Sequence, residues 1–140
     1  MSNAAQIPAV LAAIPGTYRQ RLEWFVEQVF QGVKAMPEVF FLSVEATANA
    51  AAPAEARKLV AEQGLKSMEG LARFIAEGQR AGEFKAGAPA LLAMHLLALV
   101  QGLALQRLGV ADFPFDPSVE IAMRLLLATN EASAVEKEAP

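Results

Sequence analysis

The 140-residue sequence predicts an all-α protein, a helical bundle of about five helices that form one domain. Hydrophobic residues make up 54% of the chain and aromatic residues only 7%. Alanine and leucine are abundant and runs of β-branched residues are few, a composition that favours helices over strands. Apolar residues also recur at spacings of three and four along most of the chain, which is the period of an amphipathic helix. A domain of this length can bury a substantial core.

The segment from Pro89 to Leu108 predicts the most apolar helix of the chain. Its strongly polar side chains are four: His95, Gln101, Gln106 and Arg107. A helix on the surface of a monomer has a polar face, so this helix must be covered on more than one side. About 20 residues could also cross a bilayer, but polar side chains in the middle of the segment argue against a membrane span. We therefore expect a core helix that also contacts another subunit.

The charge and the cysteine content limit the possible functions. The formal net charge is −3, whereas a nucleic-acid surface needs clustered lysine and arginine. This chain alone is therefore not expected to bind DNA. The absence of cysteine excludes disulfides, thiol catalysis and cysteine-ligated metals, and it is compatible with a reducing compartment. We expect a cytoplasmic protein, since no apolar signal-peptide core follows a basic start.

The first part of the chain predicts a leader and then a helix. Residues 1–16 are expected to be a tag remnant or linker, or the end of a connecting helix. Pro8 lies inside this segment, so no full helix is expected there. Thr17 is the predicted N-cap of the next helix. Trp24 lies off the apolar stripe of that helix and is interpreted as partly exposed, with a partner contact as the alternative. The stripe comprises Leu22, Phe25, Val26, Val29, Phe30 and Val33.

The middle of the chain predicts two more helices. A proline interrupts the pattern at Pro37, and a second helix is expected over residues 38–51. The longest predicted helix is Ala54–Ala81, with charged residues on one face and apolar residues on the other. Glycine inside a helix costs stability, so Gly64 and Gly70 indicate a kink, a close helix approach or room for a bound molecule.

The apolar helix has clear end signals and one side built from small residues. Gly82 ends the helix before it, and Pro89 is typical of a first helical turn. Small residues at Ala98 and Gly102 let a second helix approach closely. We therefore assign this side to the subunit contact, and its residues are His95, Ala98, Gly102, Leu105 and Gln106.

The last predicted helix follows a short loop. Phe113 and Phe115 in the loop are expected to cap the core. Asp116 is the expected N-cap and Pro117 the first helical residue. Residues 131–140 lack apolar spacing and are expected to be a disordered tail. The apolar stripe of the helix is wider than one neighbour needs, and it comprises Val119, Ala122, Met123 and Leu126.

The sequence predicts no catalytic site, metal site or cofactor. His95 is the only histidine, and no nucleophile-elbow pattern or phosphate-binding glycine loop is present. A metal site would depend on carboxylates, which lie mostly on solvated faces. We interpret His95 as a buried, hydrogen-bonded residue, with a pocket or a dimer interface as the alternatives.

Four segments resemble the C-terminal effector domain of TetR-family transcriptional regulators. They are IPGTYRQRLEWFVEQVF at residues 14–30, AGEF at residues 81–84, LVQGLALQRLG at residues 99–109 and DPSVEIAMRLLLA at residues 116–128. The resemblance implies that residues 17–130 form an effector-binding and dimerisation domain. It also implies that the last two helices pack against their copies in a four-helix dimer interface, to which Val119, Ala122, Met123 and Leu126 would belong.

The resemblance further implies a site between the helices for an apolar or amphipathic small molecule. Bulky or adaptable side chains on the apolar faces can line such a site, although each apolar one taken alone is more often a core residue. The candidates are Phe25, Val29, Phe41, Met68, Leu71, Phe74, Met94 and Gln101. In this interpretation the chain is the ligand-sensing part of a homodimeric regulator, and DNA binding belongs to a helix-turn-helix domain absent from this chain.

Three other interpretations stay open. The chain could sequester another regulator as a heterodimer, or it could be a stand-alone helical carrier or protein-interaction module. A small helical enzyme is the third, although the residues favour a protein without catalysis. A basic three-helix DNA reader encoded upstream in the native gene would favour the regulator over the carrier.

Overall fold

The computed structural model describes residues 7–39, 51, 53–110 and 112–127, with side chains from Val10 onward. These residues contain five helices and no strand, so the predicted all-α class is confirmed. The helices are α1 (Ile7–Ala13), α2 (Tyr18–Ala35), α4 (Ala54–Arg80), α5 (Pro89–Gly109) and α6 (Val119–Arg124). Most of the helix expected over residues 38–51, including Phe41, and the expected tail lie outside the described residues.

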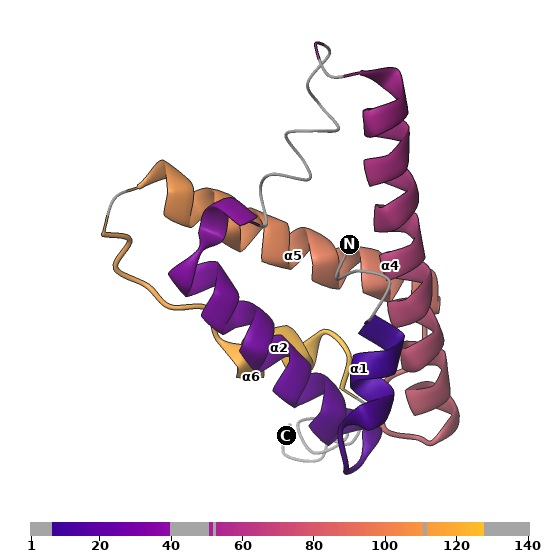
Figure 1. The fold of residues 1–140 in the computed structure, drawn as a ribbon. Coiled ribbons are helices and arrows are strands. Elements are labelled where there is room, and N and C mark those ends of the chain that lie inside the picture. The colour runs from indigo at the N-terminus through magenta and orange to yellow at the C-terminus, as the bar shows by residue number, and fades with distance from the viewer. Residues whose placement is uncertain (1–6, 40–50, 52, 111, 128–140) are drawn as a thin grey trace.

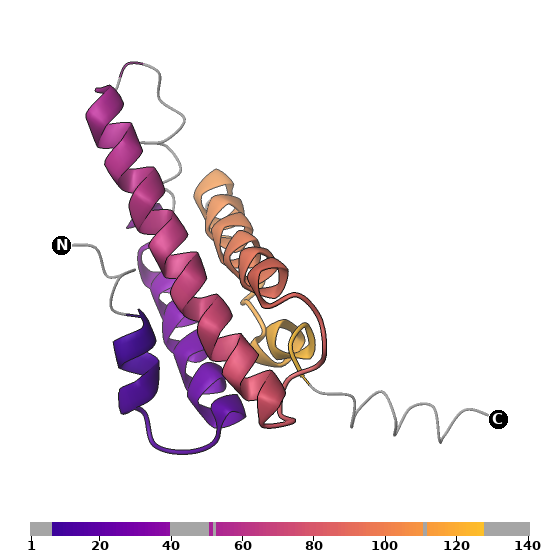
Figure 2. The same ribbon diagram turned by 90° about the vertical axis from the view of Figure 1, so that its right-hand side faces the viewer.

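The longest helix, α4, separates the other helices into two groups. In Figure 2, α1 and α2 lie on one side of α4, while α5 and α6 lie on the other. α4 contacts α1, α2 and α5, and α2 also contacts α5 and α6. Figure 1 shows α5 crossing behind α2 at a steep angle to α4. One face of α5 therefore packs against both α2 and α4.

Local capping chemistry fixes the start of α2. The Thr17 hydroxyl accepts a hydrogen bond from the Gln20 backbone N–H at 3.1 Å, and the Gln20 side chain accepts one from the Thr17 N–H at 2.9 Å. This reciprocal capping box satisfies two N–H groups that the helix itself leaves unpaired. The predicted N-cap is confirmed. The predicted stripe is confirmed as well, since four of its residues are buried: Leu22, Val26, Phe30 and Val33.

Residues 7–13 form a short helix where we expected none. Pro8 lies in the first turn of α1, where its missing N–H removes no helical hydrogen bond, and its fixed φ suits the helix. Leu11 is fully buried, and α1 contacts both α2 and α4. The helix is therefore stabilised by packing, which its seven residues could not achieve through propensity alone.

The turn between α4 and α5 reaches back to the start of α2. Gly82 adopts a φ of +77°, and the Glu83 N–H donates to the Gly78 carbonyl at 2.9 Å, which closes the end of α4. The Glu83 carboxylate then accepts hydrogen bonds from the backbone N–H groups of Tyr18 (3.3 Å) and Arg19 (3.2 Å). A residue from the turn therefore supplies a negative charge at the N-terminus of α2, where the helix dipole favours it.

The core lies where α2, α4 and α5 meet. Leu71 and Ile75 of α4 and Leu96 of α5 are buried there. At its lower end the Phe74 ring lies between two others, 5.4 Å from the Tyr18 ring centre and 6.1 Å from the Phe84 ring centre. Both separations are in the range of favourable tilted ring contacts, so Phe74 is fixed on two sides.

The start of α6 differs from the prediction. Ser118, not Asp116, caps the helix, because its hydroxyl accepts from the Ile121 N–H at 3.2 Å and the helix begins at Val119. The Asp116 carboxylate instead pairs with Lys34 at 3.4 Å and with Arg107 at 3.7 Å. Two cations from other helices draw this carboxylate away from the cap position.

Candidate functional site

The side of α5 that faces away from the core is apolar and exposed. The helix buries a stripe that comprises Ala93, Leu96, Val100 and Ala104. On the opposite side, Leu91, Met94, Leu105 and Leu108 are exposed by 54%, 43%, 52% and 41%. Together with the exposed Ala98 and Gln101 they form what we call the outward face of α5: Leu91, Met94, Ala98, Gln101, Leu105 and Leu108.

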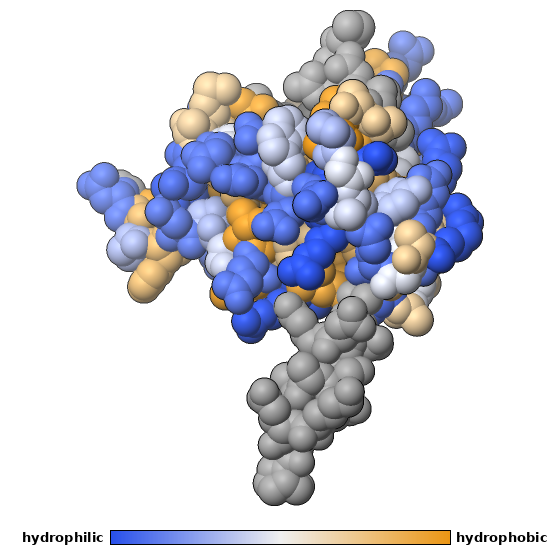
Figure 3. All heavy atoms as spheres, turned by 90° about the horizontal axis from the view of Figure 1, so that it is seen from below, coloured by the Kyte–Doolittle hydropathy of each residue, from blue (hydrophilic) through white to orange (hydrophobic). Residues whose placement is uncertain are grey.

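This outward face has the composition of a covered surface. No charged residue occurs in α5 before Arg107. Other parts of the molecule are different: Figure 3, which views the molecule from below, shows a face where hydrophilic side chains predominate and hydrophobic ones appear between them. Contiguous exposed apolar side chains indicate a contact surface, whereas single ones do not.

Within the described residues, α5 is also the one helix long and apolar enough to cross a membrane. That criterion is weak evidence, because a helix packed inside a folded bundle can meet it too. Its buried stripe contacts α2 and α4 of the same chain, which is the arrangement of a bundle helix.

The residues that we assigned to a subunit contact on α5 lie on or beside this outward face. Ala98 and Leu105 belong to it, while His95, Gly102 and Gln106 are exposed next to it. A Cβ added at Gly102 would meet no described atom within 4 Å, so space is open there. His95 is exposed, not buried as we interpreted it. Its Nδ1 donates a hydrogen bond to the Leu91 carbonyl at 2.6 Å, since a carbonyl oxygen can only accept.

The residues that we assigned to the subunit contact on α6 lie elsewhere. Ala122, Met123 and Leu126 are buried in the core of their own chain, and Val119 is half-buried against it. The apolar side chains that α6 exposes are Ile121, at 65%, and Leu125, at 39%.

The loop before α5 explains this orientation of α6. The Lys85 N–H donates to the Leu126 carbonyl at 2.9 Å, and Phe84 and Leu127 form an isolated antiparallel bridge. This pairing turns the stripe of α6 inward. The spacing of apolar residues predicted the stripe, but it could not tell which neighbour covers it.

The predicted ligand-contacting residues divide into three groups. Leu71 and Phe74 are buried in the core, and Phe25, Val29 and Met68 are half-buried and packed against it. The structure therefore brings these five together. Met94 and Gln101 lie apart from them on the outward face of α5. Phe41 is outside the described residues.

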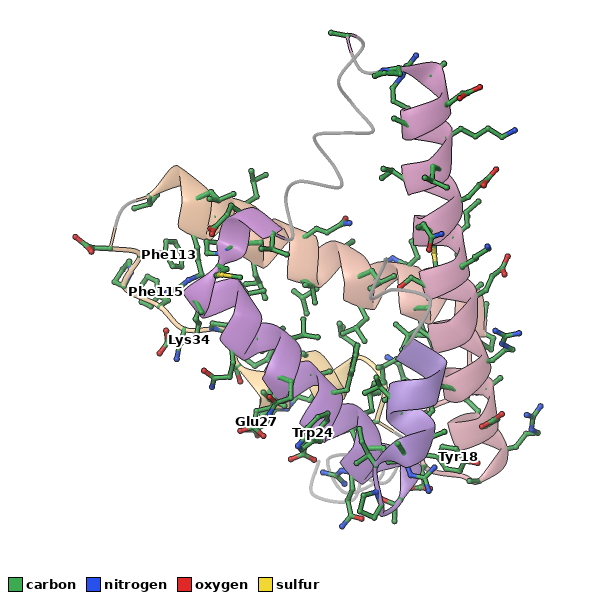
Figure 4. All side chains as sticks on the ribbon, in the orientation of Figure 1. Tyr18, Trp24, Glu27, Lys34, Phe113 and Phe115 are labelled. Carbon is green, nitrogen blue, oxygen red and sulfur yellow. The ribbon has the colours of Figure 1, made fainter. Side chains whose placement is uncertain are left out.

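The loop after α5 holds an aromatic pair that does not cap the core as predicted. The Phe113 and Phe115 rings meet edge-on with centres 5.9 Å apart, yet Phe115 is 72% exposed. Figure 4 shows both rings beside the end of α2 near Lys34, while Trp24 lies farther along α2. Trp24 is 45% exposed, as predicted. Arg107 anchors the loop by donating to the Phe115 carbonyl at 3.0 Å.

The described residues do not bring together the side chains that metal binding needs. Among them, no group of three or more His, Asp or Glu side chains is positioned to hold a metal ion. The single histidine has one ring nitrogen bonded to its own helix. The features that can carry function are therefore the outward face of α5 and the half-buried residues around the core.

The comparison with known families decides the class of this domain. A family model for the C-terminal domain of BetI-type transcriptional repressors matches residues 18–129. The chain belongs to this family. The match confirms the resemblance to the C-terminal domain of a TetR-family regulator, and it runs from α2 through α6. Neither the curated proteins nor the solved structures compared with the chain gave a match.

Membership in a repressor family places this BetI-type domain among regulators, whose C-terminal domains are not catalytic. The short helix α1 precedes the matched residues and packs on α2 and α4.

Proposed function

We propose that this domain pairs with a second copy of itself and senses an apolar or amphipathic small molecule on behalf of a cytoplasmic transcriptional regulator. Family membership supports the regulatory role. The observation that supports pairing is the exposed apolar outward face of α5. DNA contact would belong to a helix-turn-helix domain outside residues 1–140, because a net charge of −3 does not suit binding to phosphates.

The energetics favour a contact that includes more than α5. Covering a half-exposed leucine or methionine contributes roughly 1 kcal/mol, so the four large side chains of the outward face on each of two copies give roughly 8 kcal/mol. Association costs about 4–15 kcal/mol in lost translational and rotational freedom. The contribution of α5 alone is therefore marginal. The exposed Ile121 and Leu125 of α6 supply the additional apolar area that the interface needs.

The effector is assigned to the half-buried residues around the core. Phe25 and Val29 of α2 and Met68 of α4 pack against the core and still contact solvent. A molecule seated among them would change how α2 packs on α4. A ligand that prefers one packing shifts the population toward it, and this shift would be transmitted to DNA-binding domains attached to the two copies. A carrier would need no such coupling, and the family membership favours the regulator.

Binding of an amphipathic dye tests the proposed effector site. We expect anilinonaphthalene sulfonate to bind saturably, with energy transfer from Trp24, the only tryptophan, which is next to Phe25 in sequence. Phe25→Ala should weaken this binding several-fold, whereas Leu65→Ala, on the exposed part of α4, should not. Equal dye affinity of the Phe25→Ala variant and the natural chain would contradict the location, and absence of saturable binding would contradict an apolar effector.

A further inference from the structure

The six residues of the outward face of α5 follow the spacing of a helix-pairing seam. Leu91, Met94, Ala98, Gln101, Leu105 and Leu108 are separated by three, four, three, four and three residues, and all six are exposed. Residues at this alternating spacing form the a and d positions of a heptad, the seam along which two helices interdigitate. The face is therefore suited to one partner helix along its whole length.

The sizes along this seam read the same in both directions. Two large apolar residues occupy each end, and a small alanine and a polar glutamine occupy the centre. In an antiparallel pair of two such helices, Leu91 faces Leu108 of the second copy and Met94 faces Leu105. At the centre, Ala98 faces Gln101. Each layer then has a similar total volume, because the long glutamine lies over the small alanine.

A parallel pair would match these sizes poorly. Each residue would face its own copy, so two alanines at position 98 would leave a gap beside two glutamines at position 101. Gaps between packed helices forfeit the contacts of the atoms that line them. An antiparallel pair shifted by one heptad would also be worse, because it moves each Gln101 against a leucine and leaves two large apolar residues of each helix without an opposite residue.

We propose that α5 pairs antiparallel with α5 of a second copy of the chain, with the two-fold axis between Ala98 and Gln101, and that Gln101 sets this register. The two Gln101 amides lie one layer apart across the axis, where an amide N–H of one can donate to the oxygen of the other. A single polar residue in an apolar seam is a known determinant of register and orientation. The proposal rests on the pairing stated under the proposed function and adds its geometry.

The available area identifies the second element of this interface. α5 has 21 residues, so its seam is roughly 30 Å long and roughly 10 Å wide, or about 300 Å² on each copy. A stable interface buries about 800 Å² on each partner. α6 lies on the same side of α4 as α5 in Figure 2, and its exposed Ile121 and Leu125 extend the apolar surface. A second copy is the occupant whose seam matches this one at every layer.

Cross-linking of introduced cysteines tests the orientation, because the natural chain has no cysteine. Three variants are compared: Leu91→Cys, Leu108→Cys and the double variant, each treated with the short cross-linker bis-maleimidoethane and checked for helix content by circular dichroism. The antiparallel pair predicts efficient covalent dimers in the double variant and little in either single variant. Efficient cross-linking in both single variants would overturn the orientation.

Other outcomes separate this inference from the proposed function. If light scattering shows a dimer but none of the three variants cross-links, the seam is not the interface and the inference fails while pairing stands. If the natural chain is a monomer, the pairing in the proposed function fails first. The two failures are therefore distinguishable.

The role of Gln101 is tested in the same cysteine variants. Gln101→Leu removes the central amide, and we expect the dimer to persist while Leu91→Cys alone becomes several-fold more reactive toward its own copy. Gln106→Leu is the matched control, since Gln106 is exposed on α5 but outside the seam. An unchanged ratio of single-variant to double-variant cross-linking in the Gln101→Leu background would show that Gln101 does not set the register.

Discussion

At the scale of single residues, Gly78 and Phe84 make a close contact between the end of α4 and the loop that follows. A Cβ added at Gly78 would overlap the Phe84 ring, which is itself buried. We expect Gly78→Ala to lower the free energy of unfolding by about 1–3 kcal/mol, the usual cost of overpacking. Urea denaturation at a fixed protein concentration measures this change.

Gly64 in the same helix is the control for Gly78. A Cβ added there meets no described atom within 4 Å. Gly64→Ala should therefore raise the free energy of unfolding by about 1 kcal/mol through the better helix propensity of alanine. Equal effects of the two substitutions would contradict the close packing of Phe84 on Gly78.

Glu83 gives a second prediction at this scale, because its carboxylate caps α2 across 64 residues of sequence. We expect Glu83→Ala to lower the free energy of unfolding by about 0.5–2 kcal/mol, since α2 loses both acceptors and a favourable charge at its N-terminus. The loss should shrink at high salt. Glu69→Ala, an exposed position in the middle of α4, should have little effect, and a similar loss from both variants would argue against the cap.

At the scale of helices, the sequence predicts an end best where the signal is local. Thr17, Gly82 and Pro89 each act through their own backbone or their near neighbours, and all three mark the predicted helix ends. Asp116 was misassigned because its partners, Lys34 and Arg107, come from distant elements. α1 was missed for a similar reason, since packing on α2 and α4 stabilises it.

The outward face of α5 leads to a prediction about one helix. Leu105→Glu places a charge on this face, and we expect it to weaken pairing by at least about tenfold, or ~1.4 kcal/mol. Leu65→Glu on α4 is matched in exposure, 56% against 52%, and should leave pairing unchanged. Sedimentation velocity over a range of concentrations measures both. If the two variants associate as the natural chain does, the outward face is not the contact.

At the scale of the whole molecule, apolar spacing predicts which residues form a stripe but not which neighbour covers it. The stripe on α5 has a buried half and an exposed half, and the small residues Ala98 and Gly102 indicated the exposed one. On α6 the same reasoning assigned Met123 and Leu126 to a partner, whereas the turn around Lys85 directs them into their own core. Only the tertiary structure separates these two cases.

The candidate effector site shows the same limit. Leu71 and Phe74 were predicted as bulky residues on an apolar face, and they lie in the core. Met94 was predicted by the same criterion and lies on the outward face of α5. Size and polarity identify residues that need cover, but the crossing of α5 over α2 and α4 decides what covers them.

The central claim is that the apolar outward face of α5 is covered by a second copy of the chain. Size-exclusion chromatography with multi-angle light scattering at micromolar concentration tests it most directly. The account predicts a molar mass of twice 14.9 kDa. A stable species of 14.9 kDa, with the outward face of α5 exposed to water, would contradict it.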